Sequence, residues 1–187
     1  MRYLFGFLVA IGLIIMIIVL IFSGGGSKPQ TATGTGKQPL YSYANTDAEV
    51  SLTIEGPINA SEEHEAIRII VNQDQVTYQQ LSGYDGSVIK QQAYGNDEAS
   101  YSSFLKALNY AGFTLRDSTS SLSDEKGRCA TGQRYVFRMD EDDRTLLRSW
   151  ATNCGGTKTF LGNTQLAISL FQSQVPNYSD LSSTASL

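Results

Sequence analysis

Apolar and polar positions alternate through the first half of the chain and predict β-strands. Val50, Leu52 and Ile54 alternate with polar residues until a Gly-Pro pair ends the run, as in a strand with one buried face. Three further runs are rich in strand-forming residues and are bounded by turn residues. We therefore expect an antiparallel meander with strands over 50–55, 67–71, 76–81 and 87–94.

Helical spacing of apolar residues appears twice later in the chain. The first helix, over 97–112, begins at a capping Asn or Asp and repeats apolar residues at i, i+3, i+4 and i+7 from Tyr101 to Leu108. The second helix, over 163–174, has a similar apolar stripe and ends before Pro176. The sequence therefore predicts two amphipathic helices that pack on the sheet.

A β-hairpin is predicted between the two helices. Strand-like segments 134–139 and 144–150 flank the acidic turn 140–143. Cys129 and Cys154 lie equally far in sequence from the centre of that turn, so we expect a disulfide that closes the open end of the hairpin. Such a bridge contributes roughly 3 to 4 kcal/mol on the chain-entropy account.

The N-terminal run Tyr3–Phe22 predicts a transmembrane helix, because its twenty residues carry no charge and span a hydrocarbon core of about 30 Å. It is longer than the apolar region of a typical secretory signal, although Ser23-Gly24-Gly25 leaves cleavage open. Positive charge on its two sides is nearly balanced. The orientation is inferred from the cysteine pair, which suits an oxidising compartment outside the cytoplasm. Two free buried thiols in a cytosolic domain are the alternative.

These features predict an α+β protein of four parts. They are a transmembrane anchor over 1–22, a flexible Gly/Ser/Thr-rich linker over 23–47, an extracytoplasmic domain over 48–176 and a disordered tail over 177–187. The domain should contain an antiparallel sheet, two helices and the disulfide-closed hairpin. With 41% hydrophobic residues and 17% charged residues, the chain can build a core and is not an intrinsically disordered protein.

The predicted hairpin carries a concentration of arginines that suggests a binding face. If residue 136 lies opposite 146, the arginines face one another across the strands, and like charges directly opposite destabilise a sheet. An anionic envelope polymer or an acidic protein patch would relieve this repulsion, whereas nothing indicates a specific nucleic acid. A solvated face with local acidic partners, or a one-residue slip of register, is the alternative. The candidate binding residues are Arg134, Arg138, Arg144, Arg148 and Trp150.

Candidate catalytic and metal-binding chemistry is weak. His64 is the sole histidine and stands among three glutamates, but the spacing lacks the helical i, i+4 pattern that aims two ligands at one ion. No Gly-x-Ser-x-Gly motif accompanies it. We therefore predict no cofactor, no metal and no catalytic residue, and we expect a protein that is not an enzyme. A hydrolase that uses an unrecognised pair of carboxylates is the alternative.

Two resemblances bear on location. Gly6-Phe7 before an apolar run resembles the processing site of type IV prepilins, but Ile11 stands where those proteins carry Glu, and a Gly/Ser segment interrupts the helix. The second resemblance is to uncharacterised single-pass envelope proteins of Saccharibacteria-type bacteria. It rests on residues 96–113, 127–132, 134–137, 150–155 and 170–171, and it implies an envelope location but no activity.

The sequence thus predicts a binding or structural module of the cell envelope, held by a single-pass anchor with its C-terminal domain outside the cytoplasm. An envelope hydrolase and a pilin-like subunit are the alternatives. The bilayer is the expected partner of residues 3–22. The ligand, the oligomeric state and the strand order do not follow from the sequence.

Overall fold

The computed structural model describes residues 38–118, 122 and 124–187. Every strand and helix predicted within these residues is present, with ends shifted by a few positions. In chain order the elements are η1 (Leu40–Tyr43), β1 (Ala48–Glu55), β2 (Glu65–Val71), β3 (Gln75–Ser82), β4 (Ser87–Gly95), α2 (Glu98–Tyr110), β5 (Arg134–Glu141), β6 (Arg144–Thr152), α3 (Thr164–Ser173) and α4 (Tyr178–Ser182).

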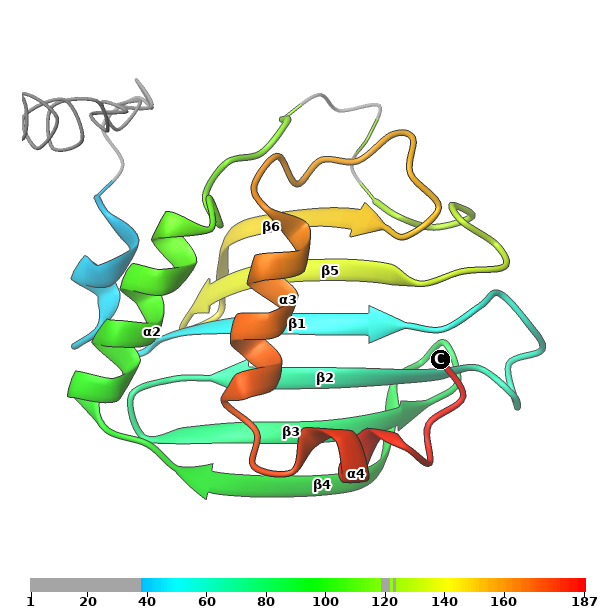
Figure 1. The fold of residues 1–187 in the computed structure, drawn as a ribbon, viewed down its shortest axis with the longest axis horizontal. Helices are drawn as coiled ribbons and strands as arrows, with labels where there is room; N and C mark the ends of the chain where they lie inside the picture. The colour runs from blue at the N-terminus through cyan, green and yellow to red at the C-terminus, as the bar shows by residue number, and fades with distance from the viewer. Residues whose placement is uncertain (1–37, 119–121, 123) are drawn as a thin grey trace, which may run out of the picture. The chain divides into compact units, whose positions relative to one another are not determined.

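The six strands form one sheet in the order β4-β3-β2-β1-β5-β6, and all neighbours are antiparallel. Strands β1 to β4 make the predicted meander. Helix α2 then carries the chain back over one face of the sheet, so that β5 pairs with the free side of β1. Figure 1 shows α2 and α3 lying on the same side of the sheet. Among the residues that the structure describes, no helix covers the opposite face of the central strands.

The core lies between the sheet and these helices. The buried apolar positions of β1 alternate along the strand, as predicted. Helix α2 begins at Asp97, whose side chain accepts a hydrogen bond from the Ser100 amide, and its apolar stripe is buried. Phe104 of α2 packs edge-on against Phe171 of α3 at 5.2 Å between ring centroids. The two helices therefore share one core with the sheet.

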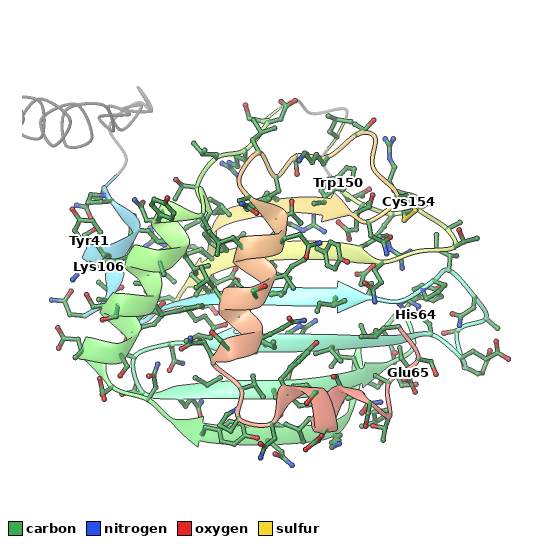
Figure 2. All side chains as sticks on the ribbon, in the orientation of Figure 1. Tyr41, His64, Glu65, Lys106, Trp150 and Cys154 are labelled. Atoms are coloured by element: carbon green, nitrogen blue, oxygen red, sulfur yellow. A yellow bond between two sulfur atoms is a disulfide. The ribbon has the colours of Figure 1, made fainter. Side chains whose placement is uncertain are left out.

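The predicted disulfide is confirmed. Cys129 and Cys154 are bonded, with their Cα atoms 5.7 Å apart, beyond the open end of the β5–β6 hairpin. Figure 2 shows Cys154 and Trp150 near the same end of that hairpin. The bridge therefore joins the segment that leads into β5 to the segment that leaves β6.

The predicted start of the domain at residue 48 is wrong. Residues 38–187 form one compact unit, and Leu40 of η1 is buried where η1 packs on α2. Because the linker was predicted from its polar composition, the isolated apolar residues at its end were assigned to it. The rest of the predicted linker, 23–37, lies outside the described residues.

The predicted disorder of residues 177–187 is also wrong. Helix α4 follows a left-handed Asn177, and the hydroxyl of Tyr78 donates to the Leu181 carbonyl at 3.1 Å. The Ser186 amide donates to a Glu65 carboxylate at 2.7 Å. Leu181 and Leu187 pack against the core. A few apolar residues among serines and threonines are therefore enough to fix this segment against the sheet.

Within residues 38–118, 122 and 124–187, no helix has the length and apolar composition needed to cross a membrane. The predicted span, Tyr3–Phe22, lies outside these residues.

Candidate functional site

The register of the β5–β6 hairpin differs from the predicted one. Val136 pairs with Trp150 and Arg138 with Arg148, and the register shifts between Met139 and Asp140. The turn is therefore centred on Asp142-Asp143 rather than on the middle of 140–143. Over the main part of the hairpin, the observed pairing differs from the predicted pairing by an even number of residues. An even difference leaves side chains on the same face, so Arg134, Arg138, Arg148 and Trp150 share one face of the hairpin, as expected.

The prediction that the arginines and the tryptophan form one exposed face is wrong. Arg134 is 2% exposed and Trp150 is fully buried. Moreover, each arginine is paired with a carboxylate: Arg134 Nε with Glu55 at 2.9 Å, Arg138 Nη2 with Asp140 at 2.7 Å, Arg144 Nη2 with Glu141 at 2.9 Å, and Arg148 Nη2 with Glu125. The repulsion that was expected to draw in an anionic partner is therefore neutralised within the protein.

Trp150 is buried where Leu122 and Arg128, which lie between α2 and β5 in the sequence, contact its ring system. The indole Nε1 donates to the Leu122 carbonyl at 2.8 Å, and the Arg128 guanidinium lies 5.9 Å from the ring centroid. The loop that contains these two residues also supplies Glu125, which is 4% exposed, to Arg148. The disulfide holds the far end of this loop at Cys129.

The uncovered face of the sheet contains a polar groove of about 430 Å³. Its lining comes from β1, β2, β5 and β6, from the loop residue Glu125 and from the β5–β6 turn. Six carboxylates and three arginines line it, with hydroxyl groups and two aliphatic side chains. The lining residues are Glu49, Ser51, Thr53, Glu55, Arg68, Ile70, Glu125, Val136, Arg138, Asp140, Asp142, Asp143, Thr145 and Arg148.

Two carboxylates lie side by side at one end of the groove. Glu49 of β1 and Asp140 of β5 are directly opposite in the register, which brings their Cβ atoms to about 5 Å. Asp140 accepts hydrogen bonds from Arg138 at 2.7 Å and from the Thr145 hydroxyl at 2.6 Å. Glu49 forms no hydrogen bond or salt bridge with any described residue. Burial, and then the charge of Asp140, raise the pKa of Glu49 above its ordinary value.

At the other end of the groove, Arg68 of β2 lies opposite Thr53 of β1. Its Nε donates to the Thr53 hydroxyl at 3.4 Å, which is a long and weak hydrogen bond. No carboxylate of the described residues lies within salt-bridge distance of it. Burial, and then the neighbouring Arg138, lower the pKa of Arg68 from its ordinary value, while the charges of Glu55 and Glu49 act in the opposite direction. Arg68 is therefore a partly buried cation with a single weak partner.

His64 is part of the packing rather than of this groove. It is 3% exposed, stacks on Tyr84 with ring centroids 4.0 Å apart, and its Nδ1 lies 3.2 Å from the Pro57 carbonyl oxygen. Figure 2 shows His64 and Glu65 at the same end of β2. In the part of the chain that the structure describes, no three His, Cys, Asp or Glu residues are grouped to hold a metal ion.

Glu49 and Arg68 were not singled out from the sequence. The signal for Glu49 was present in β1, where polar residues alternate with apolar ones and so had to face away from the apolar core. The sequence did not reveal that β1 pairs with β5. This pairing brings Glu49 beside Asp140, which lies about ninety residues later in the chain. Arg68 stood in a β-branched run that indicated a strand but not its neighbours.

Comparison with protein-family models, with curated proteins and with solved structures gives no match. The resemblance to envelope proteins of Saccharibacteria-type bacteria thus stays a prediction.

Proposed function

We propose that this protein is a binding module of the cell envelope, anchored by its N-terminal helix, and that it holds a polar ligand in the groove on the open face of the sheet. The observation that carries the proposal is the convergence of charged groups from β1, β2 and β5 on one groove. Charged side chains are rarely gathered on a partly buried surface without partners or a function. The disulfide supports an oxidising compartment.

The chemistry of the groove favours some ligands over others. Carboxylates outnumber arginines in its lining, and Arg138 and Arg148 are already paired. A long polyanion would therefore meet more repulsion than attraction along the groove. The electrostatic argument for an anionic envelope polymer, which the arginine pattern suggested, therefore no longer holds. A ligand with cationic or hydroxyl groups is more complementary to the groove. Arg68 is the one arginine of the groove that lies free of a carboxylate among the described residues.

An envelope hydrolase is the second candidate, favoured by the pair Glu49 and Asp140. Two adjacent carboxylates with different surroundings are the usual requirement for acid and base roles in glycoside hydrolysis. Here Asp140 accepts two hydrogen bonds, whereas burial raises the pKa of Glu49. Glu49 would act as the proton donor and Asp140 as the charged partner. The binding module remains the main proposal, because binding requires fewer groups than catalysis.

A sedimentation experiment tests the proposal. Full-length protein in lipid nanodiscs is mixed with insoluble cell-wall material from its host, and the fraction that sediments with the wall is measured. The Ser51→Tyr substitution places a ring on the groove floor and should abolish retention. Ser103→Tyr, at an exposed position of α2, is the matched control and should leave retention unchanged. Equal retention of both variants would refute binding at the groove.

The same samples distinguish a binder from a hydrolase. A binding module retains wall material without releasing soluble sugars or peptides. A hydrolase releases them, and the release should disappear in Glu49→Gln while sedimentation persists. Release that is unaffected by Glu49→Gln would exclude Glu49 as the catalytic acid.

A further inference from the structure

Two half-buried groups of opposite charge in the groove lack an ion-pair partner among the described residues, as do the exposed Asp142 and Asp143 at its rim. Glu49 has no hydrogen-bonding or salt-bridge partner, and Arg68 has the long bond to Thr53. The other arginines of the groove, Arg138 and Arg148, are neutralised by carboxylates. A partly buried charge is stabilised by a partner of opposite sign, so these two groups are the ones that a ligand would best complement.

Glu49 and Arg68 form no salt bridge with each other, although the charge of each influences the pKa of the other. Thr53, which lies opposite Arg68, is four residues along β1 from Glu49, which corresponds to about 13 Å along the strand. Ser51 lies between them on the same face of β1. The groove is therefore polarised, with the unpaired anion Glu49 beside Asp140 at one end and the unpaired cation Arg68 at the other, where the charge of Glu55 is neutralised by Arg134.

We infer that the groove binds a zwitterionic ligand of the short-peptide or amino-acid class, with its ammonium group between Glu49 and Asp140 and its carboxylate on Arg68. Guanidinium pairs with carboxylate through two parallel hydrogen bonds, and an ammonium group can donate to both acids. Ser51 offers a hydroxyl to the polar centre of the ligand. Ile70 and Val136 line the groove and can contact its methylene groups.

The two charges of the ligand are both needed. A simple anion on Arg68 would leave Glu49 without a cation, since Arg138 already pairs with Asp140, and a simple amine would leave Arg68 without an anion. The inference rests on the proposed function, because the same groove holds the ligand. It adds the chemical class of the ligand and the end of the groove that each charged group occupies.

A series of ω-amino acids tests the inference. Binding of glycine, 4-aminobutyrate, 6-aminohexanoate and 8-aminooctanoate to the full-length protein in nanodiscs is measured by calorimetry, with hexanoate and hexylamine as singly charged controls. Affinity should rise with chain length and be highest for the ω-amino acid whose ammonium and carboxylate groups are separated by the distance between the two ends of the groove. At equal length, removal of either charge should weaken binding at least tenfold. Hexanoate or hexylamine binding as tightly as 6-aminohexanoate would overturn the inference.

Charge-removing variants assign the two ends of the groove. Arg68→Gln should weaken binding of 6-aminohexanoate and of hexanoate by at least tenfold and leave hexylamine unchanged. Glu49→Gln should show the reverse pattern, weakening the amine and sparing hexanoate. The control variants Lys106→Gln and Glu98→Gln change exposed charges of α2 and should alter none of these affinities. Equal effects of the two groove variants on all three probes would overturn the assignment.

The result is separable from the test of the proposed function. If wall material is retained through the groove while no ω-amino acid binds, the zwitterion inference fails and the binding module stands. If the ω-amino acids bind with the expected pattern but wall material is not retained, the ligand class stands and the proposed wall target fails.

Discussion

Arg134 is a buried cation, although its place in an alternating strand suggested an exposed one. Its Nε is bonded to Glu55 and its Nη2 donates to the Gly56 carbonyl at 2.8 Å. Its Nη1 is buried without a hydrogen-bond partner among the described residues. Such a group depends strongly on the partners that it has, because a buried charge without them is very unfavourable.

We predict that Arg134→Gln destabilises the protein by about 2 to 4 kcal/mol, because it leaves Glu55 without its charge partner in a partly buried site. This reverses the expectation from sequence, in which the arginine lay on a solvated face. Arg144→Gln is the matched control. The Arg144 side chain is 69% exposed, so its loss should change stability by less than about 1 kcal/mol. Urea denaturation of both variants checks this, and equal effects would contradict it.

Glu49 should make the stability depend on pH. Its folded pKa lies above its ordinary value of 4.5, so the folded state binds more protons than the unfolded state in the window just above pH 4.5. Stability is therefore lost as pH rises through that window. Glu49→Gln removes this titration. The variant should be more stable than the parent protein at pH 7, by at most about 1 kcal/mol, and the gain should disappear at pH 4.

Thermal unfolding at the two pH values measures this effect. Glu62→Gln, at an exposed loop position, is the control, since surface substitutions change stability by about 0.5 kcal/mol or less. A gain for Glu49→Gln that is equally large at pH 4 would show that ionisation of Glu49 is not its cause.

At the scale of elements, local patterns were sufficient for the six strands and for α2 and α3, but not for η1 and α4. The alternation in β1 and the i, i+3, i+4 spacing in α2 each reflect one buried face, so the strands and helices were predicted within a few residues. Asn163 caps α3 by accepting from the Leu166 amide at 3.0 Å, as its residue type indicated. These features depend on neighbours in sequence and can be read without the tertiary structure.

The register of the hairpin was not predictable in the same way. The cysteines were assumed to be symmetric about the turn, but the two segments that join them to the strands differ in length. Cys129 lies five residues before β5 and Cys154 two residues after β6. In addition, Asp142 takes a left-handed conformation with φ of 50°, which places the turn at 142–143. Asp tolerates this conformation better than most residues.

Removal of the disulfide should loosen the loop that covers Trp150. We predict that the double variant Cys129→Ser, Cys154→Ser loses about 3 kcal/mol of stability, because the bridge no longer restricts the unfolded chain. Trp150 is the single tryptophan, and its emission should shift to longer wavelength if the loop over it opens. Denaturation and fluorescence measure the two effects. Reductant should change the parent protein and not the variant. Two free thiols in the folded, unreduced protein would contradict the bridge.

At the scale of the whole molecule, long-range pairing decides where the groove lies. The return of the chain by α2 places β5 beside β1, and this brings Glu49, Arg68 and Asp140 to one surface. No local pattern specifies that neighbour, because the free side of β1 and the outer side of β4 were both available for pairing. The sequence therefore predicted the polar face of each strand but not the groove that the faces form together.

The membrane topology is the last prediction. If the domain lies outside the cytoplasm, trypsin added to intact cells with a permeable outer layer should cut after Lys37 and release a fragment that begins at Gln38, because Pro29 after Lys28 blocks cleavage there. The fragment should resist further digestion, because residues 38–187 form a compact unit with its own core and proteases cut exposed, unfolded backbone. Mass spectrometry identifies its first residue, and replacing Lys37 by Gln should prevent its release. Digestion that requires lysis of the membrane would instead place the domain in the cytoplasm, and the groove would then face cytoplasmic ligands.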